Sequence, residues 1–137
     1  MLRFLASILL AVCVGHANGQ AIKTVYHVNT GIETAAATLN YVQNHLDIDP
    51  KAKIVVVTHA AGIDFLIEGA KDSKGREFSS AVSVLADRGV EFRVCNITLI
   101  SRNLSPDKLL MEAKIVPSGV AEVARLQAKE GYVYLKP

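Results

Sequence analysis

The run Lys53-Ile54-Val55-Val56-Val57-Thr58 decides the fold class of this chain. Consecutive β-branched residues favour an extended strand, because their side chains pack well on a pleated sheet. A strand that is apolar on both faces is typical of the middle of a parallel sheet with helices on both sides. The predicted strand ends at His59-Ala60-Ala61-Gly62.

Strand and helix patterns alternate on both sides of this run. The other strands are predicted at 24–28, 90–95, 114–117 and 132–135. Helices are predicted at about 31–46, at about 76–88, from Ser105 through Ala113, and from Ser118 to a stop at Gly131. Thr30 and Glu33 match a capping box for the first helix, and residues 63–70 form a short helix or a covering loop. The alternation predicts a three-layer α/β/α sandwich with a mainly parallel five-stranded sheet, in one domain over residues 20–137.

The strand at 90–95 carries the main candidate for chemistry. Apolar and polar residues alternate through Val90-Glu91-Phe92-Arg93-Val94-Cys95, which places Cys95 at the carboxyl end, where open α/β sheets hold ligands. Arg93, on the same predicted face, and free N–H groups in the following turn would favour the reactive thiolate. The alternative is a cysteine buried as a small apolar residue.

The polar face of this strand has three interpretations. Glu91 and Arg93 suit a thinly covered face or a contact with another subunit, because a central parallel strand is normally apolar on both faces. The alternative is an ordinary edge strand that faces solvent.

Three of the four histidines lie beyond the predicted leader and are scattered along the chain. His59 ends a strand at the same predicted edge as Cys95, and a Cys–His pair would support nucleophilic catalysis. The alternative is a histidine hydrogen-bonded to its own loop. His27 has the same two interpretations at the end of the first strand, and His45 is most simply a solvated residue.

The N-terminus has the three parts of a secretory signal peptide. Met1-Leu2-Arg3 carries a positive charge, residues 4–15 are apolar, and small residues follow in Ala17-Asn18-Gly19. We therefore expect a leader over residues 1–19, with cleavage after Ala17 or Ala21 as the second choice and a membrane anchor or buried first helix as the alternative. The apolar run is too short to span a bilayer, so no stable membrane insertion is expected after cleavage.

Charge and cysteine content limit the function classes. Loss of the leader removes one charged residue, Arg3, and lowers the formal net charge from +2 to +1. A nearly neutral chain offers no electrostatic basis for binding nucleic acid. The leader also takes Cys13, so Cys95 remains as an odd cysteine in an exported chain. It is a reactive thiol, an intermolecular bridge or a buried inert residue.

Several common site motifs are absent from the sequence. It has no glycine-rich phosphate loop, no cysteine and histidine cluster with zinc spacing, and no Gly-x-Ser-x-Gly nucleophile elbow. The residues therefore imply no metal and no organic cofactor.

The motifs resemble those of the DsrE/DsrF-like family of small sulfur-relay proteins. The resemblance rests on the runs 54–62 and 85–99 and on the ending 116–137, and the strongest element is Gly-Val-x-Phe-x-Val-Cys-x-x-Thr-Leu over residues 89–99. It implies a flavodoxin-like fold that assembles into homo-oligomers, often trimers or hexamers. It also implies a cysteine that carries sulfur as a persulfide and passes it to a partner thiol protein, and Cys95 is the corresponding position.

This chain departs from the family pattern at one point. Known relay partners are cytoplasmic, whereas the predicted leader places this chain in the periplasm or outside the cell. The sequence thus favours an exported sulfur carrier that acts on a small sulfur compound through Cys95, with His59 and Arg93 as weaker site candidates. A non-enzymatic oligomer that binds a small ligand, or a thiol redox sensor, is the alternative.

Overall fold

The computed structural model describes residues 19–137. The elements in chain order are β1 (Lys23–Val28), α1 (Ile32–Ile48), β2 (Lys53–Thr58), the 3₁₀ helix η1 (Ala60–Leu66), α2 (Phe78–Asp87), β3 (Glu91–Cys95), α3 (Asn96–Ser101), the 3₁₀ helix η2 (Pro106–Lys108), β4 (Ala113–Val116), α4 (Gly119–Glu130) and β5 (Val133–Leu135). The strands form one sheet in the order β4-β3-β2-β1-β5, and every pairing is parallel. The predicted α/β class with a five-stranded sheet is confirmed.

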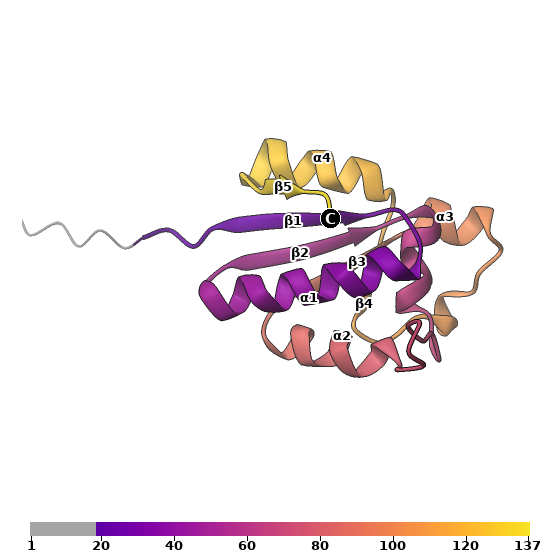
Figure 1. The fold of residues 1–137 in the computed structure, drawn as a ribbon. Helices are drawn as coiled ribbons and strands as arrows, with labels where there is room; N and C mark the ends of the chain where they lie inside the picture. The colour runs from indigo at the N-terminus through magenta and orange to yellow at the C-terminus, as the bar shows by residue number, and fades with distance from the viewer. Residues whose placement is uncertain (1–18) are drawn as a thin grey trace, which may run out of the picture.

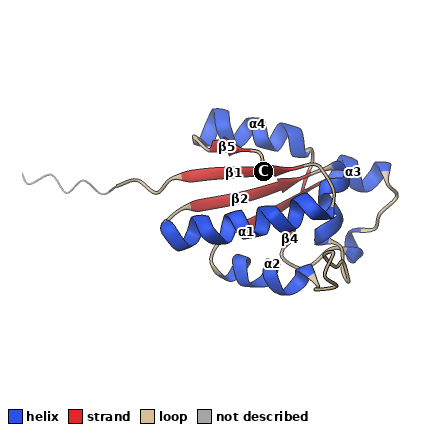
Figure 2. Ribbon diagram, viewed as in Figure 1, coloured by secondary structure: helices blue, strands red, loops and turns tan. Residues whose placement is uncertain are grey.

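Helices cover both faces of this sheet. Helices α1 and α2 lie on one face and α4 lies on the other (Figures 1 and 2). The larger apolar core lies under α1 and α2, and a smaller one lies under α4. Strand β2 supplies both cores, because Ile54 and Val56 face one layer while Val55 and Val57 face the other. This arrangement explains why β2 is apolar without interruption from Ile54 to Val57.

Helix α4 carries the chain from one edge of the sheet to the other. It follows the edge strand β4 and leads to β5, which pairs with β1 at the opposite edge. The Ser118 side chain caps the helix by accepting a hydrogen bond from Ala121 N–H at 3.3 Å. Gly131 ends the helix in the left-handed conformation, with φ of 72°. The predicted start and stop of this helix are confirmed.

Two local predictions are wrong. The helix expected from Ser105 through Ala113 is only the short turn η2, because the chain after it pairs with the end of η1 instead. Leu109 forms a bridge with Ile67, and Leu110 N–H donates to the Leu66 carbonyl at 2.8 Å. No capping box forms at α1 either, since its N-cap residue is Gly31 and no side chain caps it.

Gly62 brings η1 against the end of β1. A Cβ atom at this position would lie 2.1 Å from the Val28 carbonyl oxygen, which is backbone and cannot move aside. The start of η1 therefore needs glycine at this position for close backbone contact. This contact positions the chain that follows β2.

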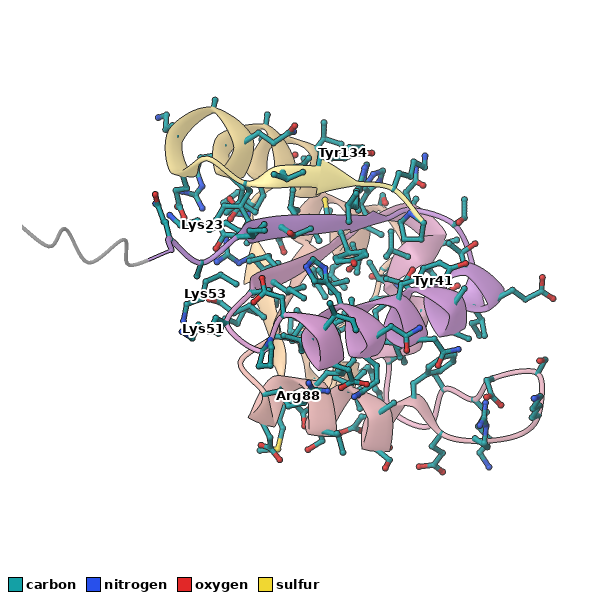
Figure 3. The ribbon with its side chains drawn as sticks, turned by 60° about the vertical axis from the view of Figure 1, so that its left-hand side comes forward. Lys23, Tyr41, Lys51, Lys53, Arg88 and Tyr134 are labelled. Atoms are coloured by element: carbon teal, nitrogen blue, oxygen red, sulfur yellow. The ribbon has the colours of Figure 1, made fainter. Side chains whose placement is uncertain are left out.

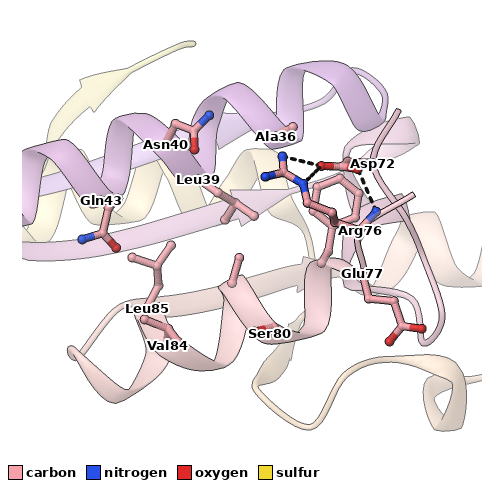
Figure 4. A pocket seen from close by; sticks show the side chains of 12 residues that line it. Ala36, Leu39, Asn40, Gln43, Asp72, Arg76, Glu77, Ser80, Val84 and Leu85 are labelled. Atoms are coloured by element: carbon pink, nitrogen blue, oxygen red, sulfur yellow. Dashed lines mark hydrogen bonds and ion pairs between the residues drawn. The ribbon is translucent and has the colours of Figure 1, made fainter. Parts of the chain in front are cut away.

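A shallow hollow of about 350 Å³ lies between α1 and α2. Leu39 and Leu85 line it, and Arg76 closes one end with an ion pair to Asp72 at 2.7 Å (Figure 4). It lies on the face of the sheet opposite α4. None of the candidate site residues predicted from the sequence lines it.

The predicted leader lies outside the described residues except for Gly19. Within residues 19–137, no helix has the length and apolar character needed to cross a membrane.

Candidate functional site

Cys95 is the last residue of β3 and the N-cap residue of α3. It is the one free cysteine in the described part of the chain. Its side chain lies on the α4 face, the same face as Arg93, as the alternation of the strand requires. Only 5% of the residue is exposed, so the thiol is buried in the single chain.

The environment of Cys95 lowers the pKa of its thiol. Burial raises the pKa, but the N–H groups of Gly119, Thr98 and Ile97 and the Thr98 hydroxyl lie against the sulfur and outweigh this effect. The Cys95 side chain makes no capping hydrogen bond to α3, and these contacts are looser than such a bond. They therefore stabilise the thiolate mainly by electrostatic attraction between partial positive charges and the sulfur. The predicted N–H groups after Cys95 are present.

Gly119, the first residue of α4, closes the site from above the sheet. A Cβ atom there would lie 3.1 Å from the Thr58 carbonyl oxygen, 3.2 Å from Cys95 Cβ and 3.3 Å from His59 Cβ. The start of α4 thus lies directly over the ends of β2 and β3. Glycine allows the helix N-terminus to approach the sulfur this closely.

His59 follows the neighbouring strand β2 directly and lies level with Cys95. Thr58 of β2 pairs with Val94 of β3, so the next residue after each is His59 and Cys95 respectively. The sequence prediction that these two residues share one edge of the sheet is confirmed. No hydrogen bond joins the imidazole to the thiol among the contacts of residues 19–137.

The backbone after His59 is held in an unusual conformation. Ala60 has φ of 51°, in the left-handed region that residues other than glycine seldom adopt. Its N–H donates to Thr98 Oγ1 at 3.0 Å, and its carbonyl accepts from Arg102 at 3.2 Å. Because Thr98 contacts both this turn and the sulfur, it couples the positions of His59 and Cys95.

A chain of hydrogen bonds leads away from His59 along the sheet edge. His59 Nε2 lies 2.7 Å from His27 Nε2, and the two rings stack with centroids 4.9 Å apart. His27 Nδ1 lies 2.8 Å from the hydroxyl of Tyr134 on β5. Burial lowers the pKa of both histidines. Lys136 lowers both further, and His59 also lowers that of His27.

Arg93 does not contact the thiol. It pairs with Glu122 of α4 and with Glu91 on its own strand, the latter at 3.0 Å. Glu122 also binds Arg125 at 2.8 Å. The polar face of β3 is therefore a network of ion pairs beside α4. The interpretation of this strand as an edge strand is wrong, because β3 lies between β2 and β4.

Other charged and histidine side chains lie away from this site. Lys23, Lys51 and Lys53 are at the amino ends of β1 and β2, the far end of the sheet from Cys95 (Figure 3). His45 is hydrogen-bonded to Tyr26 at 3.0 Å, which corrects the view that it is simply solvated. Residues 19–137 hold no group of three or more metal-ligating side chains arranged around one point.

Sequence reasoning did not find three contributors to the site: Thr98, Gly119 and Tyr134. Thr98 and Gly119 lie within runs quoted for the family motif, but their contact with the sulfur depends on α3 and α4. Tyr134 joins the site only because β5 pairs with β1. The period-two pattern of β5 predicts a strand, but it does not indicate which strand β5 pairs with.

The fold and the site together define a class: a small parallel α/β protein with one thiol at the carboxyl end of a central strand. The chain matches the DsrE/DsrF-like family over residues 9–137 and belongs to that family. No match was found among curated proteins.

The solved structures that resemble this one include the following two. The first is MTH1491 from Methanobacterium thermoautotrophicum, described as a protein of unknown function, with a TM-score of 0.76 and 29% identity over 85% of this chain and 99% of that one. The second is the YchN protein from E. coli, with a TM-score of 0.71 and 14% identity over the same shares. The second likeness concerns the fold alone.

Proposed function

We propose that this protein is an exported sulfur carrier that holds sulfane sulfur on Cys95 as a persulfide. The observation that carries the proposal is the thiol of lowered pKa at the end of β3, held by N–H groups of two helix starts. A sulfur carrier needs such a thiol, because the thiolate is the form that attacks sulfur. Family membership supports the same chemistry.

The reaction consists of two exchange steps that need no added oxidant. The Cys95 thiolate attacks the sulfane sulfur of a small donor such as thiosulfate. A new S–S bond forms, the S–S bond of the donor breaks, and its electron pair leaves with sulfite, so that Cys95 becomes Cys–S–S⁻. An acceptor thiolate then attacks the outer sulfur in the same way and restores the Cys95 thiolate.

Access to Cys95 requires local movement, since only 5% of it is exposed. Ile97 of α3 and Val120 of α4 flank it and are both exposed. These apolar side chains would suit a partner thiol protein that displaces the first turn of α4, or a second copy of this chain. We accordingly propose a homo-oligomer, a trimer or hexamer, located in the periplasm or secreted.

The test is the intact mass of the exported protein before and after incubation with thiosulfate or polysulfide. We expect a gain of about 32 Da for each added sulfur atom, reversed by reductant and absent in Cys95→Ser. The untreated protein should begin at Gln20 and migrate as an oligomer in size-exclusion chromatography. A failure to gain mass from either donor would contradict the carrier function.

The burial of Cys95 favours a second candidate function. In this alternative the protein is a non-enzymatic oligomer in which Cys95 is structural or senses oxidants, and the sheet edge holds a small ligand. A thiol that resists both sulfur donors and small alkylating reagents until the protein is denatured would support the structural form. Ready alkylation or sulfenic acid formation without persulfide would support the sensor.

A further inference from the structure

Four side chains with acid–base chemistry form a row across the carboxyl edge of the sheet. Cys95 ends β3, His59 follows β2, His27 lies in β1 and Tyr134 lies in β5. Their order follows the strand order β3-β2-β1-β5. We propose that His59, His27 and Tyr134 form a proton relay between the sulfur chemistry at Cys95 and solvent. This proposal rests on the sulfur-carrier function proposed above.

The outer links of the row are short hydrogen bonds. The two imidazoles meet through their Nε2 atoms at 2.7 Å, and the Tyr134 hydroxyl meets His27 Nδ1 at 2.8 Å. His27 uses both ring nitrogens in the relay and His59 uses only Nε2, so His59 Nδ1 is left for a reacting sulfur. His59, just after β2, and Cys95, at the end of β3, lie level without a hydrogen bond, so the leaving sulfur of a donor would complete the inner link.

Exposure along the row supports a conduit. Cys95 is 5% exposed, His59 and His27 are half-buried, and Tyr134 is 37% exposed. The thiol therefore has little direct contact with water, whereas the last hydroxyl of the row reaches it. Tyr134 lies on the edge strand β5 (Figure 3). A proton that leaves the buried end can reach solvent without an opening of the fold.

The relay has two arrangements that differ only in hydrogen positions. In the first, His59 Nε2–H donates to His27, His27 Nδ1–H donates to Tyr134, and His59 Nδ1 can accept a proton. In the second, every hydrogen bond is reversed, and His59 Nδ1–H can donate a proton. Transfer of one proton along the row converts the first into the second. His59 thus acts as a base in one arrangement and as an acid in the other.

These arrangements match the proton balance of transfer from an alkyl persulfide. The reaction begins with the Cys95 thiolate and with the row in the second arrangement. The thiolate attacks the outer sulfur of R–S–SH, the donor S–S bond breaks, and R–S⁻ leaves with its electron pair. His59 Nδ1–H protonates R–S⁻, and a proton that enters through Tyr134 converts the row to the first arrangement. The Cys–S–SH group then gives its proton to His59, a proton leaves through Tyr134, and the products are Cys–S–S⁻ and R–SH. In this cycle His59 is the catalytic residue, and His27 and Tyr134 are positioning residues.

The electrostatic environment favours the neutral form of both histidines. Burial and Lys136 lower the pKa of both imidazoles, so they are neutral at neutral pH. A neutral imidazole has one N–H donor and one acceptor nitrogen, which the relay requires.

The test compares two donors that differ in leaving group. Thiosulfate releases sulfite, which needs no added proton, whereas glutathione persulfide releases a thiolate whose ordinary pKa is about 8.5 and which gains from protonation. Persulfide formation on Cys95 is followed by intact mass with each donor. We expect Tyr134→Phe and His27→Gln to slow transfer from glutathione persulfide about tenfold or more, and to leave transfer from thiosulfate within about twofold.

Tyr132→Phe is the matched control, because it removes a hydroxyl from the same C-terminal segment and leaves His27 untouched. It should change neither rate. Equal slowing with both donors, or no slowing in Tyr134→Phe, would overturn the relay while the carrier function stands. If the protein without substitutions forms no persulfide with either donor, the carrier function is overturned and the relay with it.

Discussion

Replacement of Gly119 by alanine tests how α4 controls the thiol. The added Cβ would lie 3.1–3.3 Å from the Thr58 carbonyl oxygen and from the Cβ atoms of Cys95 and His59. Contacts this close require the start of α4 to withdraw by a few tenths of an ångström. The Gly119 N–H withdraws with it, and this is the group that lowers the thiol pKa most. The thiol pKa should therefore rise towards its ordinary value.

The stability change follows from two opposing effects. Overpacking of a tight contact costs about 1–3 kcal/mol, and the better helix propensity of alanine offsets at most about 1 kcal/mol. We expect a net loss of about 0–3 kcal/mol in the free energy of unfolding. Urea denaturation measures it. A gain in stability would show that the start of α4 is not packed as described.

The thiol pKa is read from the ultraviolet absorbance of the thiolate as pH is varied, in a background with Cys13→Ser. Gly31→Ala is the matched control, because it adds the same methyl group at another helix start, where no atom lies within 4 Å. It should leave the titration of Cys95 unchanged. An unchanged titration in Gly119→Ala as well would refute the view that the N-terminus of α4 stabilises the thiolate.

Two further predictions concern the charges around the site. Glu122→Gln removes the carboxylate that pairs with the mostly buried Arg93. The free energy of unfolding, measured by urea denaturation, should fall by about 1–3 kcal/mol. This loss is smaller than for a fully buried pair, because Arg93 keeps its ion pair with Glu91. Glu130→Gln, at an exposed pair, is the control and should change it by less than about 1 kcal/mol. A histidine whose folded-state pKa lies below its unfolded value of about 6.5 stabilises the fold above that pH and loses this contribution as pH falls through the folded value. Because the pKa values of both site histidines are lowered, the urea concentration at the unfolding midpoint should fall on acidification below about pH 6.5. His27→Gln should make that fall shallower. An identical pH profile in the variant would count against the histidine environment described.

The sheet and the main candidate residue were predictable from the sequence for one reason. Local patterns determine which segments are strands, and the carboxyl ends of parallel strands must meet at one edge. The run at 53–58 therefore predicted a central strand, and His59 and Cys95 were correctly expected at the same edge. The residues around Cys95 also predicted N–H groups that favour the thiolate.

The rest depends on contacts between segments that are distant in the chain. The expected helix after Ser105 failed because Leu109 and Leu110 pair with the end of η1, which overrides a local start signal. Arg93 was placed on the correct face, but its partner Glu122 comes from α4. No local pattern shows that β5 pairs with β1, so Tyr134 could not be placed beside His27.

The crossing of α4 from one edge of the sheet to the other has a consequence for folding. His27 and Tyr134 are 107 residues apart in the chain and meet only after β5 has paired with β1. Pairing of such distant segments is slow, since the entropy of closing a long loop must be overcome first. The bond between them therefore forms late, and a chain that lacks its last four residues cannot form it at all. The proposed relay is therefore complete only in a fully folded molecule, and partly folded chains carry Cys95 without the Tyr134 hydroxyl beside His27.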